Sequence, residues 1–431
     1  MPLSRRSFLA ACAVPPALAV AAGEAPAAFA ERRRRLAESA GSGVICLLGY
    51  DRSEGRSGFT GFRQESNFFY LTGHDEPGAA LLIAPAAGRD GYREILFLPR
   101  QSEASAMWSG PRRSPGSADG LGFGEVLEAG RLRGELRSLL RDRRRLMGLR
   151  PRHPAPPDAV LERASFDRLA QLAGDSGVRD IRGPLAALRS VKSPAEVALL
   201  CRAARATESA FRAAWRSVRP GAVERSVAAE FVAEAFRAGC ERLAFPPMAG
   251  SGPNAAILHY QRNGSVMRDG QLLLLDAGGE RSRYAADIAR TVPVGGRFTA
   301  RQRLLYELVL KALRAAIAAA RPGIALEGGG PRSLRSVAER VLRSGAPEGV
   351  LTHLPHALGH HVGLDVHDPA PPRGAMQAGM VLAVEPGIYL PREGLGIRIE
   401  DMIEITPDGS RLLSDGLPAG ADGIERALAS G

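Results

Sequence analysis

Residues 272–294 read LLLLDAGGERSRYAADIARTVPV, and this segment carries the strongest structural signal in the second half of the chain. Four consecutive leucines ending at Asp276 are typical of a buried strand. A second strand-like run begins near Asp287, after a glycine-rich turn. We expect the two runs to form a hairpin, which would bring the two carboxylates together.

Two more carboxylates follow near the end of the chain. In GIRIEDMIEIT, residues 396–406, apolar and charged residues alternate, so a strand would turn Arg398 and Glu400 to the same face. Arg398 would then be placed to orient a ligand carboxylate. Glu385 lies in AVEPGIY, where a Pro-Gly pair cuts a strand short, a usual place for a ligand at the end of an element.

The histidines are clustered. Six of the eight lie between His259 and His367, and His360 belongs to the run HALGHHVGLDVHD that begins at His356. One imidazole and four carboxylates suit Mn, Fe, Co or Zn better than thiolate-seeking copper, and four acidic ligands can hold two ions. Each residue alone has an ordinary alternative, a turn aspartate or a structural histidine. Together they predict a two-metal hydrolase centre formed by Asp276, Asp287, His360, Glu385 and Glu400.

Six segments, in this order and spacing, resemble the pita-bread metallopeptidases, specifically aminopeptidase P and its relative prolidase. They are ILHYQRN, LLLLDAGGE, YAADIARTVPVGG, HALGHHVGLDVHD, VEPGIY and GIRIED. The resemblance runs from about Leu188 to Thr406. It implies a mixed α/β (α+β) protein whose catalytic domain, residues 188–425, has a curved antiparallel sheet.

The resemblance also implies the ligand roles. Asp276 would bind one ion through both oxygens, Asp287 and Glu400 would bridge the two ions, and His360 and Glu385 would complete the second. Manganese is the first expectation for the two divalent ions, with Co, Zn and Fe as alternatives. A hydroxide between the ions would be the nucleophile.

The remaining candidates surround this centre. Glu385 could accept a proton from the water and return it to the leaving nitrogen. His356, His259 and His367 match histidines that line the family's pocket, where they would stabilise the oxyanion and orient the substrate. The alternative for each is a structural histidine bonded to backbone. His361 has no match in the family's ligand set.

Three functions remain open. The first is release of the first residue from peptides with proline in second position, whose imide nitrogen carries no proton for ordinary peptidases to recognise. The second is prolidase activity on Xaa-Pro dipeptides, which substrate length would distinguish. The third is a metal-free binding protein of the same fold, against which the five retained ligands argue.

The first thirty residues predict export. SRRSFLA, residues 4–10, resembles a twin-arginine signal, and an apolar stretch follows that ends in the small-residue site Ala-Phe-Ala at 28–30. We therefore expect the twin-arginine machinery as a partner and a periplasmic or secreted location. An uncleaved anchor and a lipoprotein box ending at Cys12 are the alternatives.

Residues 31–180 carry several strand-like runs and predict a smaller α/β domain. The segment 63–83, RQESNFFYLTGHDEPGAALLI, resembles the amino-terminal domain of creatinase and aminopeptidase P, and Trp108 in MWSGPR resembles a Trp-x-Gly-x-Arg feature of that domain. In the family this domain assembles oligomers, so a dimer or tetramer is implied. The alternative for Trp108 is an ordinary packed aromatic.

Helix signals open the second domain. Ser193-Pro194-Ala195-Glu196 is a capping box, a second helical pattern covers 223–238, and Thr299 with Gln302 marks a third helix start. The resemblance to the pita-bread fold implies that these helices cover one face of the curved sheet and that the other face carries the metals.

Composition excludes little else. The net charge is +11, but nearly all basic residues are arginine, and the runs 32–35 and 143–145 lack interleaved aromatics, so we expect no nucleic-acid partner. The cysteines form no CxxC pair and say little about function.

Overall fold

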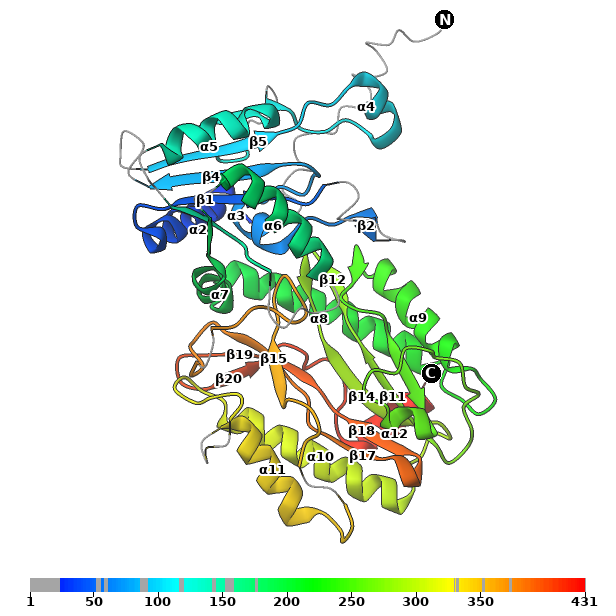
Figure 1. Cartoon of the computed structure of the whole chain (residues 1–431). Helices are drawn as coiled ribbons and strands as arrows, with labels where there is room; N and C mark the ends of the chain where they lie inside the picture. Colours follow the sequence, from blue (N-terminus) through cyan, green and yellow to red (C-terminus); the bar gives the residue numbers. More distant parts are fainter. Residues whose placement is uncertain are drawn as a thin grey trace, which may run out of the picture. The chain divides into compact units, whose positions relative to one another are not determined.

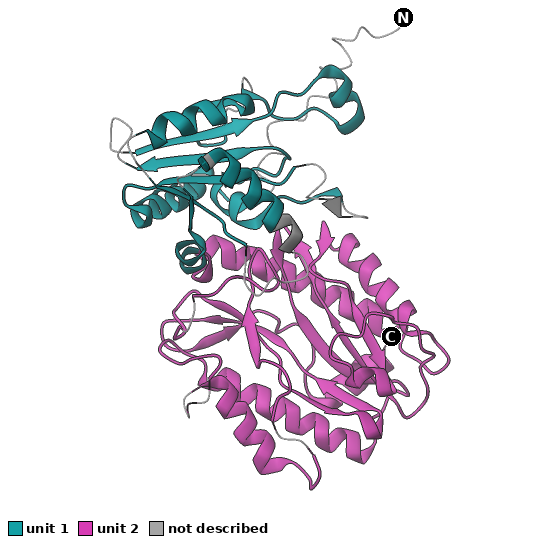
Figure 2. Cartoon of the chain, in the orientation of Figure 1, with its two compact units in different colours: residues 1–188 teal, residues 189–431 magenta. Residues whose placement is uncertain are grey.

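The computed structural model describes residues 24–51, 56–57, 61–85, 92–115, 120–141, 145–151, 159–174, 177–328, 330, 333–350, 353–371 and 374–430. The chain forms two compact units, residues 1–188 and 189–431 (Figure 2). The twin-arginine motif and most of the expected signal lie outside the described residues, as do Arg143 and Arg144.

The first unit contains a mixed six-stranded sheet with the order β6-β5-β4-β1-β7-β8. The pairs β1–β4 and β4–β5 are antiparallel, and the outer pairs are parallel. The expected α/β domain is therefore present. The strands are β1 (Val44–Leu48), β4 (Ala80–Pro85), β5 (Tyr92–Leu98), β6 (Val126–Glu128), β7 (Leu146–Gly148) and β8 (Val178–Asp180), and β2 (Arg56–Ser57) pairs separately with β3 (Gly61–Phe62). The helices are α2 (Pro26–Ala40), α3 (Ser66–Thr72), α4 (Glu103–Ser109), α5 (Leu132–Leu140), α6 (Ala159–Ala173) and α7 (Arg182–Ser190).

The start of this unit differs from the expected boundary at residue 31. Helix α2 begins at Pro26, so the Ala-Phe-Ala site lies inside a packed helix. Phe29 is buried edge-on against Phe69, with ring centroids 6.3 Å apart. Arg32 Nη2 donates to Glu24 Oε1 at 2.5 Å, and both side chains are buried. Residues 24–30 therefore belong to the folded unit. The contacts that place them there are not visible in a local sequence pattern.

The second unit is built from short antiparallel sheets (Figure 1). One contains β10 (Met248–Ser251), β11 (Leu272–Ala277) and β14 (Ile288–Pro293), and another contains β15 (Gly359–His361), β16 (Val381–Val384), β19 (Asp401–Ile405) and β20 (Ser410–Leu412). Smaller sheets are formed by β9 (Arg242–Leu243), β12 (Gly279–Arg281) and β13 (Tyr284–Ala285), and by β17 (Gly387–Leu390) and β18 (Leu395–Arg398). A bridge between Ala289 and Glu400 joins β14 to the β18–β19 connection.

Helices α8 and α9 lie on one side of these strands and α10 and α11 on the other (Figure 1). The capping boxes at Ser193 and Thr299 are confirmed, and they start α8 and α10. The helices are α8 (Pro194–Trp215), α9 (Glu224–Arg237), α10 (Ala300–Ala319), α11 (Leu334–Gly345) and α12 (Ala421–Ala429). One apolar core connects helices and strands, which leaves the polar site residues on the inner faces of the strands.

Within the described part of the chain, no helix is long and apolar enough to cross a membrane.

Candidate metal and catalytic centre

The predicted pairing of the two aspartate-bearing strands is confirmed. β11 and β14 are antiparallel, with Asp276 opposite Ala289, and Asp287 directly precedes β14. The connection is longer than a simple turn, because it contains the short strands β12 and β13. Both carboxylates are buried. The strand pair thus brings the two side chains into one region, as expected.

The other three candidate ligands come from the strands that face this pair. His360 lies in β15 opposite Ala383 of β16, and Glu385 directly follows β16. The Glu385 amide donates to the Leu358 carbonyl at 2.8 Å. The Glu400 amide donates to the Ala289 carbonyl at 3.0 Å, which ties Glu400 to the aspartate strands.

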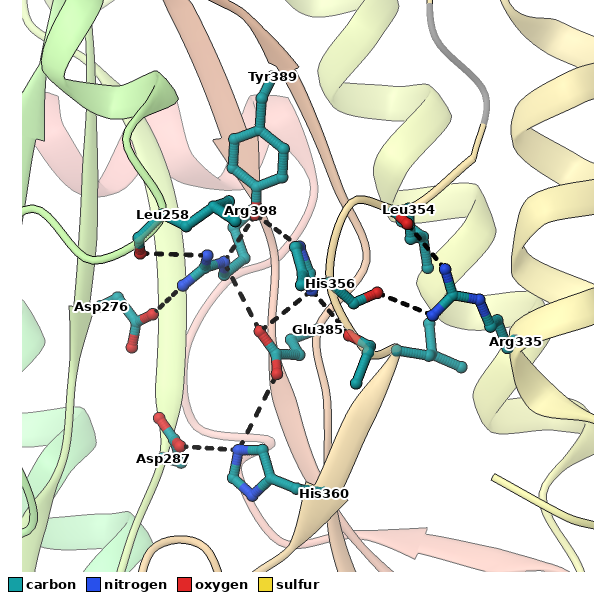
Figure 3. Close-up of polar contacts among 12 residues, drawn as sticks. Leu258, Asp276, Asp287, Arg335, Leu354, His356, His360, Glu385, Tyr389 and Arg398 are labelled. Atoms are coloured by element: carbon teal, nitrogen blue, oxygen red, sulfur yellow. Dashed lines mark hydrogen bonds and ion pairs between the residues drawn. The ribbon is translucent and has the colours of Figure 1, made fainter. Parts of the chain in front are cut away.

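The ligand atoms converge in the way that a cation site requires. One atom each from Asp287, His360 and Glu400 lies within 4.8 Å of the other two. His360 Nε2 is 3.2 Å from Asp287 Oδ2 and 3.9 Å from Glu385 Oε1 (Figure 3). Asp276 Oδ1 is buried with no hydrogen-bond partner among the described residues. These oxygens and one imidazole nitrogen fit a hard or borderline divalent ion.

The shifted pKa values of the site residues also indicate a cation site. Burial raises the pKa of both Asp276 and Glu385 to about 7, with repulsion from Asp287 adding to the shift and Arg398 opposing it. Burial followed by repulsion from Asp287 raises the pKa of Glu400 well above its usual value. Burial lowers the pKa of His360, but the hydrogen bond to Asp287 and the negative charges of Asp287 and Glu385 together outweigh burial and raise the pKa to about 9. The cluster therefore holds more negative charge than a buried site keeps without a cation.

Arg398 is committed to the protein's own groups. Its Nη1 donates to Asp276 in a very short contact, its Nε donates to the Tyr389 hydroxyl at 2.8 Å, and its Nη2 reaches the Leu258 carbonyl at 3.4 Å (Figure 3). The sequence led us to expect that Arg398 orients a ligand carboxylate. In this structure the carboxylate that it orients is Asp276.

His356 lies on the other side of Glu385. Its Nδ1 is 2.7 Å from the Ala357 carbonyl and 3.8 Å from Glu385 Oε2, and its Nε2 is 2.9 Å from the Tyr389 hydroxyl. Burial and then the charge of Arg398 lower the pKa of His356 to about 4. Because a carbonyl only accepts, Nδ1 carries the proton and Nε2 accepts from Tyr389. The imidazole is thus neutral in this arrangement.

The other two pocket histidines are also near the centre. His367 packs edge-on against His360, with ring centroids 4.4 Å apart. His259 is exposed, but its charge lies close enough to lower the pKa values of both His356 and His367. His361 follows His360 in β15 and so turns to the opposite face, toward Lys192 and Asp368. It does not join the ligand set.

Two features of the site escaped sequence reasoning. Tyr389 links His356 to Arg398, and its only signal was an aromatic four residues after Glu385. Glu224, fully buried at the start of α9, accepts bonds from the Ser251 amide at 2.7 Å and the Ser265 amide at 2.8 Å, and its Oε2 accepts from the Tyr260 hydroxyl at 2.9 Å. Glu224 thereby shapes the segment that carries His259.

Comparison with known proteins identifies the family. The profile of metallopeptidase family M24 matches residues 198–407, and that of the aminopeptidase P N-terminal domain matches residues 29–147. Human Xaa-Pro aminopeptidase 3 is 32% identical over 390 residues, covering 85% of this chain and 76% of the relative. Xaa-Pro aminopeptidase of Escherichia coli is 31% identical over 434 residues, covering 93% and 97%.

Solved structures of aminopeptidase P also match this chain. The low-pH form of aminopeptidase P from E. coli superposes with a TM-score of 0.80 at 29% identity, covering 94% of this chain and 99% of that chain. A zinc-substituted form of the E. coli enzyme with product gives a TM-score of 0.79 at the same identity and coverage. The chain therefore belongs to the M24 metallopeptidases, within their aminopeptidase P group.

Proposed function

We propose that this protein is a metal-dependent Xaa-Pro aminopeptidase, which hydrolyses the bond between the first residue of a peptide and a proline in second position. The observation that carries the proposal is the convergence of three buried carboxylates, the partly buried Glu385 and His360 from two facing sets of strands. The relatives named Xaa-Pro aminopeptidase and the E. coli aminopeptidase P structures with substrate and product give the substrate class.

The five residues would hold two divalent ions. Their four carboxylates balance the charge of two divalent ions better than that of one. Asp276 Oδ1 has no hydrogen-bond partner among the described residues, so it is available to bind an ion. We favour manganese, with Co, Zn and Fe as alternatives. When bound, such ions supply a Lewis acid and acidify a water molecule. The ligands in this proposal are Asp276, Asp287, His360, Glu385 and Glu400.

Glu385 is placed to move the proton. Its Oε1 faces His360 and its Oε2 faces His356, so the carboxylate spans the ligand set and the pocket histidines. A carboxyl whose pKa lies near 7 accepts and returns a proton readily at neutral pH. The prolyl nitrogen carries no hydrogen and has to gain one to leave. We assign that transfer to Glu385.

The histidines would orient the peptide and its carbonyl oxygen. His356, His259 and His367 surround the carboxylates, and His356 is fixed by Tyr389. To donate a hydrogen bond to an oxyanion, the His356 imidazole would have to turn its protonated Nδ1 away from the Ala357 carbonyl. Such donors stabilise a transition state by roughly 2.7–4 kcal/mol in related chemistry.

Prolidase activity is the second candidate, and it is not favoured. The match to the aminopeptidase P N-terminal domain and the names of the relatives both favour the aminopeptidase. A metal-free binding protein is disfavoured because all five ligand positions keep their chemistry.

Substrate length provides the test. The Mn-loaded protein is incubated with an Xaa-Pro-Yaa tripeptide and, separately, with the matching Xaa-Pro dipeptide, and the products are identified by mass. Release of Xaa from the tripeptide is the expected result. Cleavage of the dipeptide alone would identify a prolidase, and cleavage of neither by metal-bound protein would refute the proposal.

We also propose that the protein is exported through the twin-arginine pathway and works as a dimer or tetramer. The motif SRRSFLA supports export, and the aminopeptidase P N-terminal domain supports assembly. Replacing Arg5 and Arg6 by lysine should retain the protein in the cytoplasm, as cell fractionation would show. An unchanged distribution would refute the export route.

A further inference from the structure

The segment that carries His356 is held from outside the metal site by an arginine of α11. Arg335 Nη1 donates to the His356 carbonyl at 2.9 Å, and Arg335 Nη2 donates to the Leu354 carbonyl at 2.7 Å (Figure 3). The guanidinium is planar and its donors are fixed relative to one another. One side chain therefore sets the positions of two carbonyls two residues apart.

The arginine is itself fixed by two carboxylates. Its Nε donates to Glu339 Oε1 at 3.1 Å and its Nη1 to Glu327 Oε2 at 3.2 Å. Each carboxylate also accepts a backbone N–H of the same segment, Glu339 from Leu354 at 3.2 Å and Glu327 from Leu358 at 2.5 Å. Four backbone groups of the segment are thus hydrogen-bonded to three charged side chains.

This arrangement replaces the secondary structure that the segment lacks. The described residues 353–358 contain no helix or strand, and β15 begins only at Gly359. Without ladder hydrogen bonds, the backbone position of His356 depends on side-chain partners. The imidazole of His356 then meets the Tyr389 hydroxyl at 2.9 Å and lies 3.8 Å from Glu385 Oε2.

We propose that Arg335 is a positioning residue of the active site, which holds the His356 imidazole against Tyr389 and Glu385 by binding the Leu354 and His356 carbonyls. The inference rests on the proposed function, because it matters for turnover only if His356 acts in the reaction. A displacement of about 1 Å can cost about a hundredfold in rate. Loss of Arg335 should therefore lower kcat by about tenfold to a hundredfold, with a smaller change in KM.

A double-mutant cycle tests this directly. Arg335→Met, His356→Ala and the double variant are compared in kcat and KM on an Xaa-Pro-Yaa tripeptide, with bound metal and Tm measured for each. If Arg335 acts through His356, Arg335→Met should lower kcat less than about threefold in the His356→Ala background. Metal content should be unchanged. Arg343→Met, an exposed arginine on the same helix, is the matched control and should keep wild-type kcat.

A conservative variant completes the design. Arg335→Lys keeps the charge but cannot reach both carbonyls in fixed geometry, so its kcat should lie between wild type and Arg335→Met. If Arg335→Met does not fold, the lysine variant carries the cycle. Equal losses in the wild-type and His356→Ala backgrounds would overturn the inference, as would an unchanged kcat in a folded Arg335→Met.

The experiments distinguish failure of the Arg335 inference from failure of the proposed function. An impaired His356→Ala with an unimpaired Arg335→Met overturns only the role of Arg335. Unchanged turnover in His356→Ala removes His356 from the reaction and overturns both the inference and the role proposed for His356. Absence of tripeptide cleavage by the wild-type protein refutes the proposed function itself.

Discussion

The individual carboxylates of the candidate metal site largely determine its electrostatic free energy. Asp276 and Glu400 are buried and Glu385 is largely buried beside them, and burial with mutual repulsion raises the pKa of each. Arg398 and His360 provide the positive charge that faces them. Without bound ions, these carboxyls are stabilised by protons, which makes the folded state sensitive to pH.

We expect the metal-free protein to lose stability as the pH rises from about 4.5 to about 7. The pKa of Glu385 is raised from 4.5 to about 7 in the folded state, so folding retains a proton that the unfolded chain releases. The stabilisation is therefore full below the unfolded pKa and is lost as the pH rises through the folded pKa. Chelated protein should show this as a falling Tm, measured by calorimetry.

Glu385→Gln and metal-loaded protein are the controls for this pH effect. The glutamine cannot titrate, so its Tm should fall less over the same pH range. Bound ions take the place of the protons, so the loaded protein should not show the loss. A Tm for the chelated wild type that falls no more than that of Glu385→Gln would contradict the assignment.

Replacement of a ligand and replacement of a pocket histidine should differ in their effect on metal. Asp287→Ala removes a carboxylate that lies 3.2 Å from the His360 nitrogen, so bound metal and activity should both be lost. His356→Ala should keep its metal and lose about a hundredfold to a thousandfold in kcat, as expected for a lost transition-state donor. Metal analysis with kinetics checks both.

The outcome of these two variants is unambiguous. Unchanged turnover in Asp287→Ala would refute the two-metal centre. Metal loss in His356→Ala would show that this residue is a ligand. His361→Ala, which removes the neighbouring imidazole on the opposite face of β15, should retain metal.

At the scale of elements, the strands and helices with strong local signals could be predicted. The leucine run gave β11, and the capping boxes gave the starts of α8 and α10, because those signals lie within a few residues. The strand pair β12–β13 and helix α11 were missed. Strands β12 and β13 are only two or three residues long, too short to show a periodic pattern, and β12 is fixed by pairing with the distant β9. Helix α11 does have apolar residues at helical spacing after the N-cap Ser333, a local signal that could have located it.

The site shows the same division between local and distant information. The candidate ligand positions could be proposed from the sequence because each lies in a distinctive segment, and the structure brings these segments together. The bonds of Tyr389 to His356 and Arg398, and of Arg335 to the His356 carbonyl, could not be predicted, because they join residues 9 to 33 positions apart in the sequence. Local patterns do not encode such partners.

Helix α2 gives a prediction at this scale. A chain starting at Glu31 would lack Phe29 and Glu24, leaving Arg32 without its carboxylate and exposing part of the core. We expect it to be less stable than a chain starting at Glu24 by about 3 kcal/mol or more, the usual cost of removing a buried phenylalanine. Denaturant unfolding of the two truncated proteins, followed by fluorescence and circular dichroism, measures the difference.

Equal stability of the two truncated proteins would show that residues 24–30 contribute nothing to the folded unit. The variant Glu24→Ala in the longer protein separates the ion pair from the contribution of Phe29. Since the pair is buried, loss of Glu24 should itself destabilise, because the buried Arg32 would lose the carboxylate that balances its charge.

For the whole molecule, part of the net charge of +11 lies on arginines buried in the first unit. Two arginines of the run 32–35 are buried inside the protein. Arg33 is fully buried and paired with Glu94 at 2.7 Å, and Arg32 is paired with Glu24. A buried arginine contributes to the formal charge without offering its donors to a partner, so the formal charge overstates the charge available at the surface.

Association of the whole chain should depend on helix α4. Trp108 is 87% exposed and the adjacent Met107 is 74% exposed, so the alternative of a packed aromatic within this chain does not hold. An aromatic and a thioether side by side form an apolar patch whose removal from water favours association. We expect Met107→Ser combined with Trp108→Ser to shift the oligomer toward monomer, as measured by sedimentation velocity at several concentrations.

Leu304→Ser is the matched control, because Leu304 is also an exposed large apolar residue but lies on α10, in the other unit. It should leave the sedimentation profile unchanged if association depends on the α4 patch rather than on surface hydrophobicity in general. A wild-type protein that is monomeric at all concentrations would refute the proposed assembly. An oligomer that persists in the Met107→Ser, Trp108→Ser variant would instead assign the interface to another surface, since the serines remove the apolar area on which the α4 contact depends.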